Sequence, residues 1–564
     1  MRGAFAWTAG VVALALSLGV AYAAYLLADH SWDQVVSYET PFGDYDRAWA
    51  LGALPPEVEL PADAHRVVLV IVDGLRLDVT DQMPNFQTLR QYGADMVALT
   101  VQPSLSYPTW TAILSGATPD VSGVTTNWFD GAVPVETVID TALGAGRTVV
   151  VSGPQDLATL YAADRAQATF FREWTKEYMS GTYVDQAIAL ADGRDPSLVV
   201  VHLPDTDDAG HEYGGTSDEY ILAAQRIDGE IMRLVAEFAD DRTLFVITSD
   251  HGHVQAGGHG GWEPVVTRVP ALFIGPASSI DRERISQTDI APTVAAFLGV
   301  PVPAHAEGRV RPELLLPGRV DSRIGDAHAK EFATGYLATL GAPDDALAAA
   351  RTADQVAVVI SDARTERLAA DRAERLPLAL ALGALVLRVP GIVFASSWRA
   401  GTAIAAGVLA YYLVYNGLYF IVHGHRWSLS AFNTESFVEQ FFYLRMAEAA
   451  LAGVIGAAVA AGVYPLLRSG PKGPRDRRFL GGWLALGPAT VFVIMATLVA
   501  QVAWFYWAWG FDVVWRLPDM RWGFKYLLDL TQITALGAAA VLAPVVTYLA
   551  GRFHPRVRIQ TAEE

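Results

Sequence analysis

The chain alternates between long uncharged stretches and segments in which apolar and polar residues are mixed. The first uncharged stretch, Ala4–Leu27, has about the ~20 apolar residues that a membrane-spanning helix needs. We therefore predict an N-terminal anchor. A cleaved signal peptide is the alternative, because Ala21–Ala23 resembles a small-residue cleavage site behind the basic Arg2. Five further spans are predicted at Leu376–Ala395, Thr402–Val422, Tyr443–Leu467, Phe479–Gly510 and Tyr526–Leu549.

The segment between these spans has the pattern of a globular domain. Short runs in it are apolar on both faces and rich in β-branched residues, which is typical of buried parallel strands. These runs are Arg66–Val72, Arg147–Gly153, Ser197–Leu203, Thr243–Ser249 and Pro270–Gly275. Helical patterns separate them, notably Ser217–Ala239 and Thr288–Gly299. The alternation predicts an α/β domain whose mostly parallel sheet is flanked by helices, with ligands bound where the strands end.

Charge predicts how the chain is oriented in a membrane. The loop Arg468–Phe479 carries five basic residues and one acidic residue, and the segment Gly551–Arg558 is also basic. The positive-inside rule puts both in the cytoplasm. Counting spans backward from this loop, or forward from Arg2, places the α/β domain on the outer, extracytoplasmic face of the cell membrane.

These patterns divide the chain into six predicted parts. They are an N-terminal transmembrane anchor (1–30), a linker (31–64), an exported catalytic α/β domain (65–325), a helical stalk (326–375), a five-span transmembrane domain (376–550) and a cytoplasmic tail (551–564).

Composition narrows the chemistry of the exported domain. The net charge of −19 leaves no basic surplus to neutralise phosphates, which excludes nucleic acid as a partner. The chain has no cysteine, so disulfides and thiolate metal sites are excluded. Any metal ion must therefore be held mainly by His, Asp and Glu.

Such side chains follow three of the predicted strands, and two of these groups contain histidines at short spacing. The residues are Asp73, Asp207, His211, Asp250, His251 and His259. An Asp after a strand is more often a turn former, but that interpretation does not explain why all three groups fall at one sheet edge. Carboxylates and neutral imidazoles suit zinc, and the set exceeds what one tetrahedral ion takes. We predict two divalent ions, Zn²⁺ with Mn²⁺ or Mg²⁺ as alternatives, and two ions can hold both reacting oxygens of a phosphoryl transfer.

A nucleophile is expected nearby. Ser104 and Ser106 precede a helix that is predicted to open at Pro108, because proline is favoured in a first helical turn. A hydroxyl there would lie beside free N–H groups that attract a phosphoryl oxygen. The alternative is that Ser106 only caps the helix.

Four motifs in this order resemble the alkaline phosphatase superfamily. They are VDGLRLD (72–78), SLSYPTW (104–110), HLPDTDDAGHEYG (202–214) and TSDHG followed by GGHGG (248–261). Within that superfamily they are similar to the type I phosphodiesterase/nucleotide pyrophosphatases and, more closely, to the GPI ethanolamine phosphate transferases. The resemblance spans Arg66–Gly308 and implies an alkaline-phosphatase-like sheet. It selects Ser106 as the nucleophile, because the hydroxyl residue of that motif stands two positions before a proline.

The resemblance also implies a ligand set. One ion would take Asp73, Ser106, Asp250 and His251, and the other would take Asp207, His211 and His259. Asp205 and Asp208 are rivals of Asp207 in nearby register. Candidate substrate-binding residues are Thr109, Asn127 and His253. Thr109 stands where nucleotide pyrophosphatases carry an Asn that touches phosphate, and His253 is expected behind the ligands or facing the substrate.

By this resemblance the chain is a membrane-anchored, metal-dependent phosphodiesterase or phosphotransferase that forms a phospho-Ser106 intermediate. A membrane lipid is the expected partner, with transfer of a headgroup such as phosphoethanolamine to a glycolipid or lipid-linked glycan. The first alternative is a nucleotide pyrophosphatase that hydrolyses soluble diesters, and the second is a catalytically silent membrane scaffold. The aromatic loop His423–Phe442 is expected outside, where it either guides lipid or forms an interfacial belt.

Overall fold

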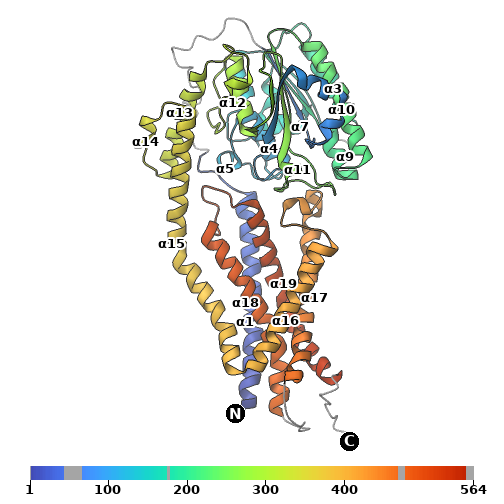
Figure 1. Ribbon diagram of the computed structural model, residues 1–564, viewed down its shortest axis with the longest axis vertical. Coiled ribbons are helices and arrows are strands. Elements are labelled where there is room, and N and C mark those ends of the chain that lie inside the picture. The colour runs from blue at the N-terminus through green and yellow to red at the C-terminus, as the bar shows by residue number, and fades with distance from the viewer. Residues whose placement is uncertain (1, 43–65, 175–177, 468–476, 554–564) are drawn as a thin grey trace.

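The computed structural model describes residues 2–42, 66–174, 178–467 and 477–553. Figure 1 shows an α/β domain stacked on a bundle of long helices. Most of the predicted linker (31–64) and of the predicted tail (551–564) lies outside the described residues, and the part of the linker up to Val36 continues the first helix.

One eight-stranded sheet forms the centre of the α/β domain, in the order β4-β3-β5-β1-β6-β7-β2-β8. The strands are β1 (Arg66–Val72), β2 (Gly93–Leu99), β3 (Val149–Pro154), β4 (Ala168–Arg172), β5 (Leu198–Leu203), β6 (Thr243–Ser249), β7 (Arg268–Ile274) and β8 (Ile280–Ser286). All neighbouring strands are parallel except β7, which runs antiparallel to both β6 and β2. The prediction of a mostly parallel sheet is confirmed. β7 runs the other way because residues 250–267 stay at the edge where β6 ends, so the chain re-enters the sheet from there.

Helices cover both faces of this sheet. They are α3 (Pro84–Leu89), α4 (Ser106–Ser115), α5 (Pro119–Ser122), α6 (Val138–Gly144), α7 (Gln155–Tyr161), α8 (Ser180–Ala191), α9 (Asp205–Tyr213), α10 (Asp218–Phe238), α11 (Pro264–Thr267) and α12 (Ile290–Leu298). Successive residues of β1 point to opposite faces: Val67 and Leu69 enter the core beneath α4 and α12, whereas Val68 and Val70 enter the core beneath α8 and α10. Both faces of the sheet are buried beneath helices, which explains the continuous apolar runs in the sequence.

The predicted stalk is partly a packing layer of the α/β domain. It contains α13 (Ser322–Leu340), α14 (Asp345–Ala349) and the long α15 (Ala353–Ser396). Tyr336 of α13 is fully buried in the core, and its ring stacks on that of Phe42 with centroids 4.5 Å apart. α15 leaves this layer and runs down beside the helix bundle (Figure 1).

Five helices among the described residues are long and apolar enough to cross a membrane: Gly10–Val36, Trp398–Val422, Val438–Leu467, Trp483–Trp509 and Met520–Ala550. They belong to α1 (Arg2–Val36), α16 (Trp398–Asn416) with its continuation, α17 (Val438–Val463), α18 (Arg477–Trp509) and α19 (Met520–Phe553). These helices indicate that the chain is an integral membrane protein. The remaining predicted span, Leu376–Ala395, is the C-terminal half of α15. Side chains at 387 and 389–396 lie outside the described residues, so this span stays a prediction.

The N-terminal helix is part of the bundle. Ala21 and Ala24 are buried in the core that α1 forms with α18 and α19. A Cβ on Gly537 of α19 would lie only 2.7 Å from the Cβ of Ala21, so the two helices touch closely there.

Candidate functional site

The sheet brings the predicted ligands to one edge. β1 pairs in parallel with β5 and β6, in a register that places Val72 beside both Leu203 and Ser249. The three strands therefore end level with one another, and the acidic residues that follow them meet. Asp73, Asp207 and Asp250 are all buried there.

The first ligand group gathers around His251. Its Nε2 lies 3.5 Å from Asp73 Oδ1 and 3.3 Å from Asp250 Oδ2. The hydroxyl of Ser106 lies 3.2 Å from the same nitrogen. Helix α4 begins at Ser106, two residues before the predicted start, because a proline is tolerated throughout a first turn whose N–H groups are free. The hydroxyl of Ser106 is hydrogen-bonded to His251, so it faces the ligand group.

The second ligand group gathers around Asp207. His211 stands four residues later on α9, and its Nε2 lies 3.3 Å from Asp207 Oδ2. His259 Nε2 lies 3.9 Å from Asp207 Oδ1 and 3.2 Å from His211 Nε2. His253 Nε2 approaches closest, 2.8 Å from Asp207 Oδ1. With His251 Nε2 at 4.0 Å from its Oδ1, Asp207 is thus approached by four imidazoles.

The hydrogen bonds of the imidazoles show that the donor set fits a cation. His211 Nδ1 faces the side-chain oxygen of Asn433 at 3.0 Å, and His259 Nδ1 faces the carbonyl of Ser104 at 3.3 Å. Both acceptors require Nδ1–H, which leaves a lone pair on each Nε2. These two lone pairs face each other at 3.2 Å beside a carboxylate, an arrangement that only a shared cation or proton stabilises.

Electrostatics lead to the same conclusion. Burial, with Asp250 and Asp207 alongside, raises the pKa of Asp73 well above its usual range. Asp73 Oδ1 and His251 Nδ1 are buried without a hydrogen-bond partner. Burial and the neighbouring His251 lower the pKa of His259 well below its usual value, which keeps the imidazole neutral, as a metal ligand must be. Groups of three ligand atoms lie within 4.8 Å of one another in three combinations: Asp73, Asp250 and His251; Asp207, His251 and His259; and Asp207, His211 and His253.

The residues behind the ligands hold Asp250 in place. Its Oδ2 accepts a hydrogen bond from the Trp110 indole at 2.8 Å, and its Oδ1 accepts one from the backbone N–H of Gly74 at 2.9 Å. Gly74 has φ +69°, and a Cβ on it would lie 2.8 Å from His253 Nε2 and 2.9 Å from Asp207 Cα. Only glycine allows the two ligand groups to approach so closely.

The structure distinguishes the candidates that the sequence left as rivals. Ser104 donates its hydroxyl to the carbonyl of Gly261 at 2.6 Å, so it is not free to act as a nucleophile. Asp205 accepts the N–H groups of Met179 and Ser180 at the start of α8, at 2.8 and 2.7 Å. Asp208 lines the cavity beside the site, where burial and the charges of Asp207 and Asp205 raise its pKa to about 7.

A cavity of about 1570 Å³ of empty space, its open mouth included, lies in front of Ser106. Of the three predicted substrate-binding residues, only Asn127 lies on its wall, with Oδ1 accepting from the N–H of Tyr107 at 3.0 Å. Thr109 is buried, and its hydroxyl donates to the carbonyls of Leu105 and Ser106 within its own helix. His253 is fully buried behind Asp207. The structure therefore does not bring Thr109 or His253 to the cavity.

Sequence reasoning missed the contact between this site and the helix bundle. Ser428 and Ser430, in the loop before α17, donate their hydroxyls to Glu263 Oε2 at 3.0 and 2.9 Å. The Trp262 indole donates to the carbonyl of Trp427 at 2.8 Å. Asn433 of the same loop reaches His211 and lines the cavity. From its aromatic content this loop was expected to guide lipid or to form an interfacial belt, and its hydrogen bonds to Glu263 and His211 were not predicted.

This fold and site define a domain of the metal-dependent phosphoryl-transfer class. Residues 67–267 match the family model described as type I phosphodiesterase / nucleotide pyrophosphatase, so the chain carries that domain and the resemblance predicted from its motifs is confirmed.

The chain is similar to curated GPI ethanolamine phosphate transferases. It is 26% identical to the mouse transferase 3 catalytic subunit over 301 residues, which is 48% of this chain and 27% of that protein. It is 25% identical to mouse transferase 1 over 316 residues, 46% of this chain and 34% of that protein. With transferase 1 of Saccharomyces cerevisiae the identity is 24% over 338 residues, 49% of this chain and 36% of that protein. The chain thus spans about a third of the length of these relatives.

Solved structures of similar shape include murine ectonucleotide pyrophosphatase / phosphodiesterase 5, with a TM-score of 0.37 and 13% identity. The matched region is 42% of this chain and 96% of the chain in that structure. The wild-type alkaline phosphatase PafA has a TM-score of 0.39 and 13% identity, and covers 45% of this chain and 100% of its own.

Proposed function

We propose that the protein is a membrane-anchored, metal-dependent phosphotransferase that moves phosphoethanolamine from a phospholipid to a glycolipid or lipid-linked glycan. The observation that carries the proposal is the position of Ser106. Its hydroxyl, in the first turn of α4, is hydrogen-bonded to His251 Nε2 at 3.2 Å and lines a cavity that residues of the bundle loop complete. The similarity to GPI ethanolamine phosphate transferases supports the choice of headgroup.

The metal ions would be held by two groups of side chains. Asp73, Asp250 and His251 would hold one with the Ser106 hydroxyl, and Asp207, His211 and His259 would hold the other. His253 competes with His259 for a place in the second group, since both face Asp207. When bound, two divalent cations supply positive charge that favours the ionised Ser106 hydroxyl and neutralises phosphate oxygens.

The reaction has two balanced halves. Ser106 Oγ forms a bond to phosphorus while the bond from phosphorus to the diacylglycerol oxygen breaks. The serine proton goes to water, and the released alcohol takes one from water. An acceptor hydroxyl oxygen then bonds to phosphorus, the bond to Ser106 Oγ breaks, and the acceptor's proton returns to the serine.

The residues that line the cavity favour binding of a small cationic headgroup over binding of a nucleotide. Asp156, Asp208 and Glu212 line it, with the aromatic rings of Trp128 and Trp174. Carboxylates and aromatic faces attract an ammonium group. Among the described lining residues there is no Lys or Arg that would neutralise further phosphates.

The membrane placement belongs to the same proposal. The α/β domain would lie on the extracytoplasmic face, because the positive-inside rule puts the basic loop Arg468–Phe479 and the basic segment Gly551–Arg558 in the cytoplasm. α1 would anchor it from the N-terminal side, and the helices from α15 to α19 would form the transmembrane domain.

The test compares transfer with hydrolysis in the detergent-solubilised full chain. Wild type should move labelled phosphoethanolamine from phosphatidylethanolamine to a GPI precursor, and chelation should stop it. Ser106→Ala should abolish both transfer and cleavage of a chromogenic diester while keeping its zinc. Ser104→Ala, which loses only the hydrogen bond to Gly261, should keep most of the activity. Hydrolysis of nucleotide diesters without any transfer would favour the pyrophosphatase instead, and an undiminished Ser106→Ala variant would refute the nucleophile.

A further inference from the structure

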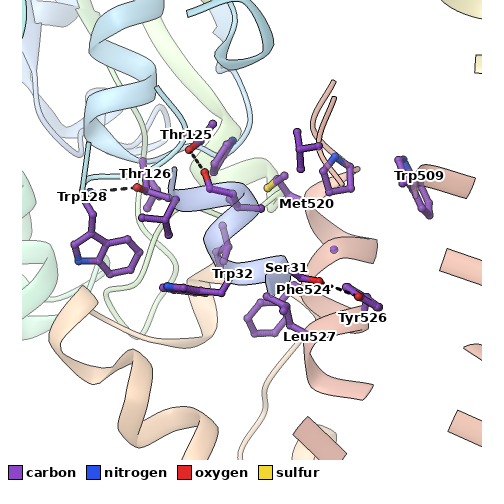
Figure 2. Close-up of a pocket in the computed structure, with 18 of the residues that line it drawn as sticks. Ser31, Trp32, Thr125, Thr126, Trp128, Trp509, Met520, Phe524, Tyr526 and Leu527 are labelled. Carbon is purple, nitrogen blue, oxygen red and sulfur yellow. Dashed lines mark hydrogen bonds between the residues drawn. The ribbon is translucent and has the colours of Figure 1, made fainter. Parts of the chain in front are cut away.

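A second cavity lies beside the candidate metal centre, where the α/β domain meets the helix bundle (Figure 2). It encloses about 1140 Å³ of empty space, its open mouth included. In Figure 2, Thr126 and Trp128 of the α/β domain lie on one side of it and Phe524 and Leu527 of α19 on the other, with Trp32 of α1 between them. Three of the candidate membrane spans, in α1, α18 and α19, contribute to its wall.

The wall of this cavity is mostly apolar, and several of its polar groups already have hydrogen-bond partners. The hydroxyls of Ser31 and Tyr526 lie 2.9 Å apart, and Thr125 donates its hydroxyl to the carbonyl of Val35. Asp512 is paired with His30 at 2.8 Å. Most of the remaining surface is aromatic or aliphatic, including Trp32, Val35, Trp128, Phe505, Phe524 and Leu527. Among the described lining residues, Asp512 and Arg516 are the only acidic or basic side chains besides His259. The surface therefore suits a hydrocarbon chain.

This apolar cavity adjoins the cavity in front of Ser106. Four residues line both of them: Trp128, His259, Asn433 and Thr434. His259 is also one of the residues that face Asp207. A chain that lies between α1 and α19 is therefore separated from the cavity of Ser106 only by side chains that line both cavities.

A phosphodiester has two arms on one phosphorus, and the two cavities differ as the two arms of a phospholipid do. The acidic wall with Asp156, Asp208 and Glu212 suits the cationic headgroup. The apolar wall suits the arm that carries the hydrocarbon. Both arms are present on the donor before reaction, so both cavities must be filled together, whereas the acceptor arrives only after the alcohol has left.

We propose that the apolar cavity between α1, α18 and α19 binds an acyl chain of the donor phospholipid and thereby places its phosphorus at Ser106. This inference rests on the proposed function, in which the donor is a phospholipid. The bundle then takes part in substrate selection, because its helices form the chain site.

The chain site can be tested with 4-nitrophenyl phosphoethanolamine whose nitrophenyl ring carries acyl chains of graded length, used below its micelle-forming concentration. For the full-length wild type, kcat/KM relative to the acyl-free probe should rise about fourfold for each added methylene group until the cavity is filled. Leu527→Trp fills the cavity and should flatten this rise. Val541→Trp, on the outward face of the same helix, should keep it. Val35→Trp repeats the block from α1, in case Leu527→Trp fails to fold.

The outcomes separate the chain site from the proposed donor. A rise with chain length that Leu527→Trp and Val35→Trp remove supports the cavity, even if phosphatidylethanolamine proves not to be the donor. A rise that both variants keep, or no rise at all, overturns the chain site even if phosphoethanolamine transfer is confirmed.

A binding readout removes turnover from the test. Ser106→Ala protein should be photolabelled by phosphatidylethanolamine carrying a diazirine on its chain, with adducts on both Trp32 of α1 and Phe524 of α19. Labelling confined to outward residues such as Val541, and unchanged by Leu527→Trp, would overturn the proposal.

Discussion

The side chain of Asn433 makes two hydrogen bonds to His211, although the two residues are 222 positions apart. Its side-chain oxygen accepts from His211 Nδ1 at 3.0 Å, and its amide nitrogen donates to the His211 carbonyl at 2.5 Å. Asn433 belongs to the loop between α16 and α17, so a segment of the helix bundle sets the tautomer and orientation of an imidazole at the candidate metal centre. Partners of this kind commonly govern metal affinity as strongly as some ligands do.

Replacing Asn433 should therefore weaken the second metal site. We expect Asn433→Leu to lower the zinc affinity of that site by about 10- to 100-fold, because His211 loses the acceptor that fixes its Nε2 lone pair. Chelator competition on the purified full chain measures this. Asn433→Asp keeps the acceptor and should retain most of the affinity, and Thr434→Ala is the control in the same loop. Equal affinities in Asn433→Leu and wild type would contradict the role.

Glu263 should keep the same loop docked. It is buried and accepts the hydroxyls of Ser428 and Ser430. Glu263→Ala leaves both donors unpaired, a change worth about 1–3 kcal/mol for each buried group. Amide hydrogen exchange across residues 427–434 should accelerate, and phosphotransfer should fall. The exposed Glu219→Ala is the control, and unchanged protection in Glu263→Ala would show that other contacts dock the loop.

Gly74 should tolerate no side chain. A Cβ there would lie 2.8 Å from His253 Nε2 and 2.9 Å from Asp207 Cα, at a φ of +69° that alanine rarely adopts. Gly74→Ala should therefore separate the two ligand groups and reduce bound zinc. In the matched Gly229→Ala, on α10, the new methyl group meets nothing within 4 Å, and alanine stabilises a helix by up to about 1 kcal/mol. Metal analysis and thermal unfolding compare the two, and normal zinc in Gly74→Ala would refute the steric argument.

Features of the fold and site could be predicted where they depend on residues next to one another in the chain. They could not be predicted where they depend on contacts between distant segments. Asp73 and Asp250 were found because each directly follows a strand whose pattern is strong, and parallel strands necessarily end at one edge. The strand β8, Ile280–Ser286, was missed because it is an edge strand rich in charge, and β2 because glycine, Asp and Met interrupt its β-branched pattern. Asn433 could not have been found, because its role depends on docking between segments far apart in the chain. His253 was expected either behind the ligands or facing the substrate, and its buried position next to Asp207 required coordinates.

The junction between the two parts of the protein should also respond to pH through Asp120. This carboxylate accepts the N–H of Leu517, in the loop before α19, at 2.7 Å. Burial, with the charge of Glu307 nearby, raises the pKa of Asp120 from 3.8 to about 6. The folded state then binds the proton more tightly than the unfolded chain does, so this group favours folding most at low pH, and its contribution is lost as the pH rises from about 4 through about 6. The pKa difference corresponds to at most about 3 kcal/mol.

Asp120→Asn keeps an acceptor for Leu517 but cannot ionise. Its unfolding midpoint in detergent should therefore change less between about pH 5 and about pH 7.5 than that of wild type, and at the higher pH it should be the more stable protein. The exposed Asp130→Asn should behave like wild type. The same pH dependence in Asp120→Asn and wild type would mean that Asp120 does not titrate with folding. It would also mean that the contact with Leu517 holds the junction equally well with the carboxyl group charged or neutral.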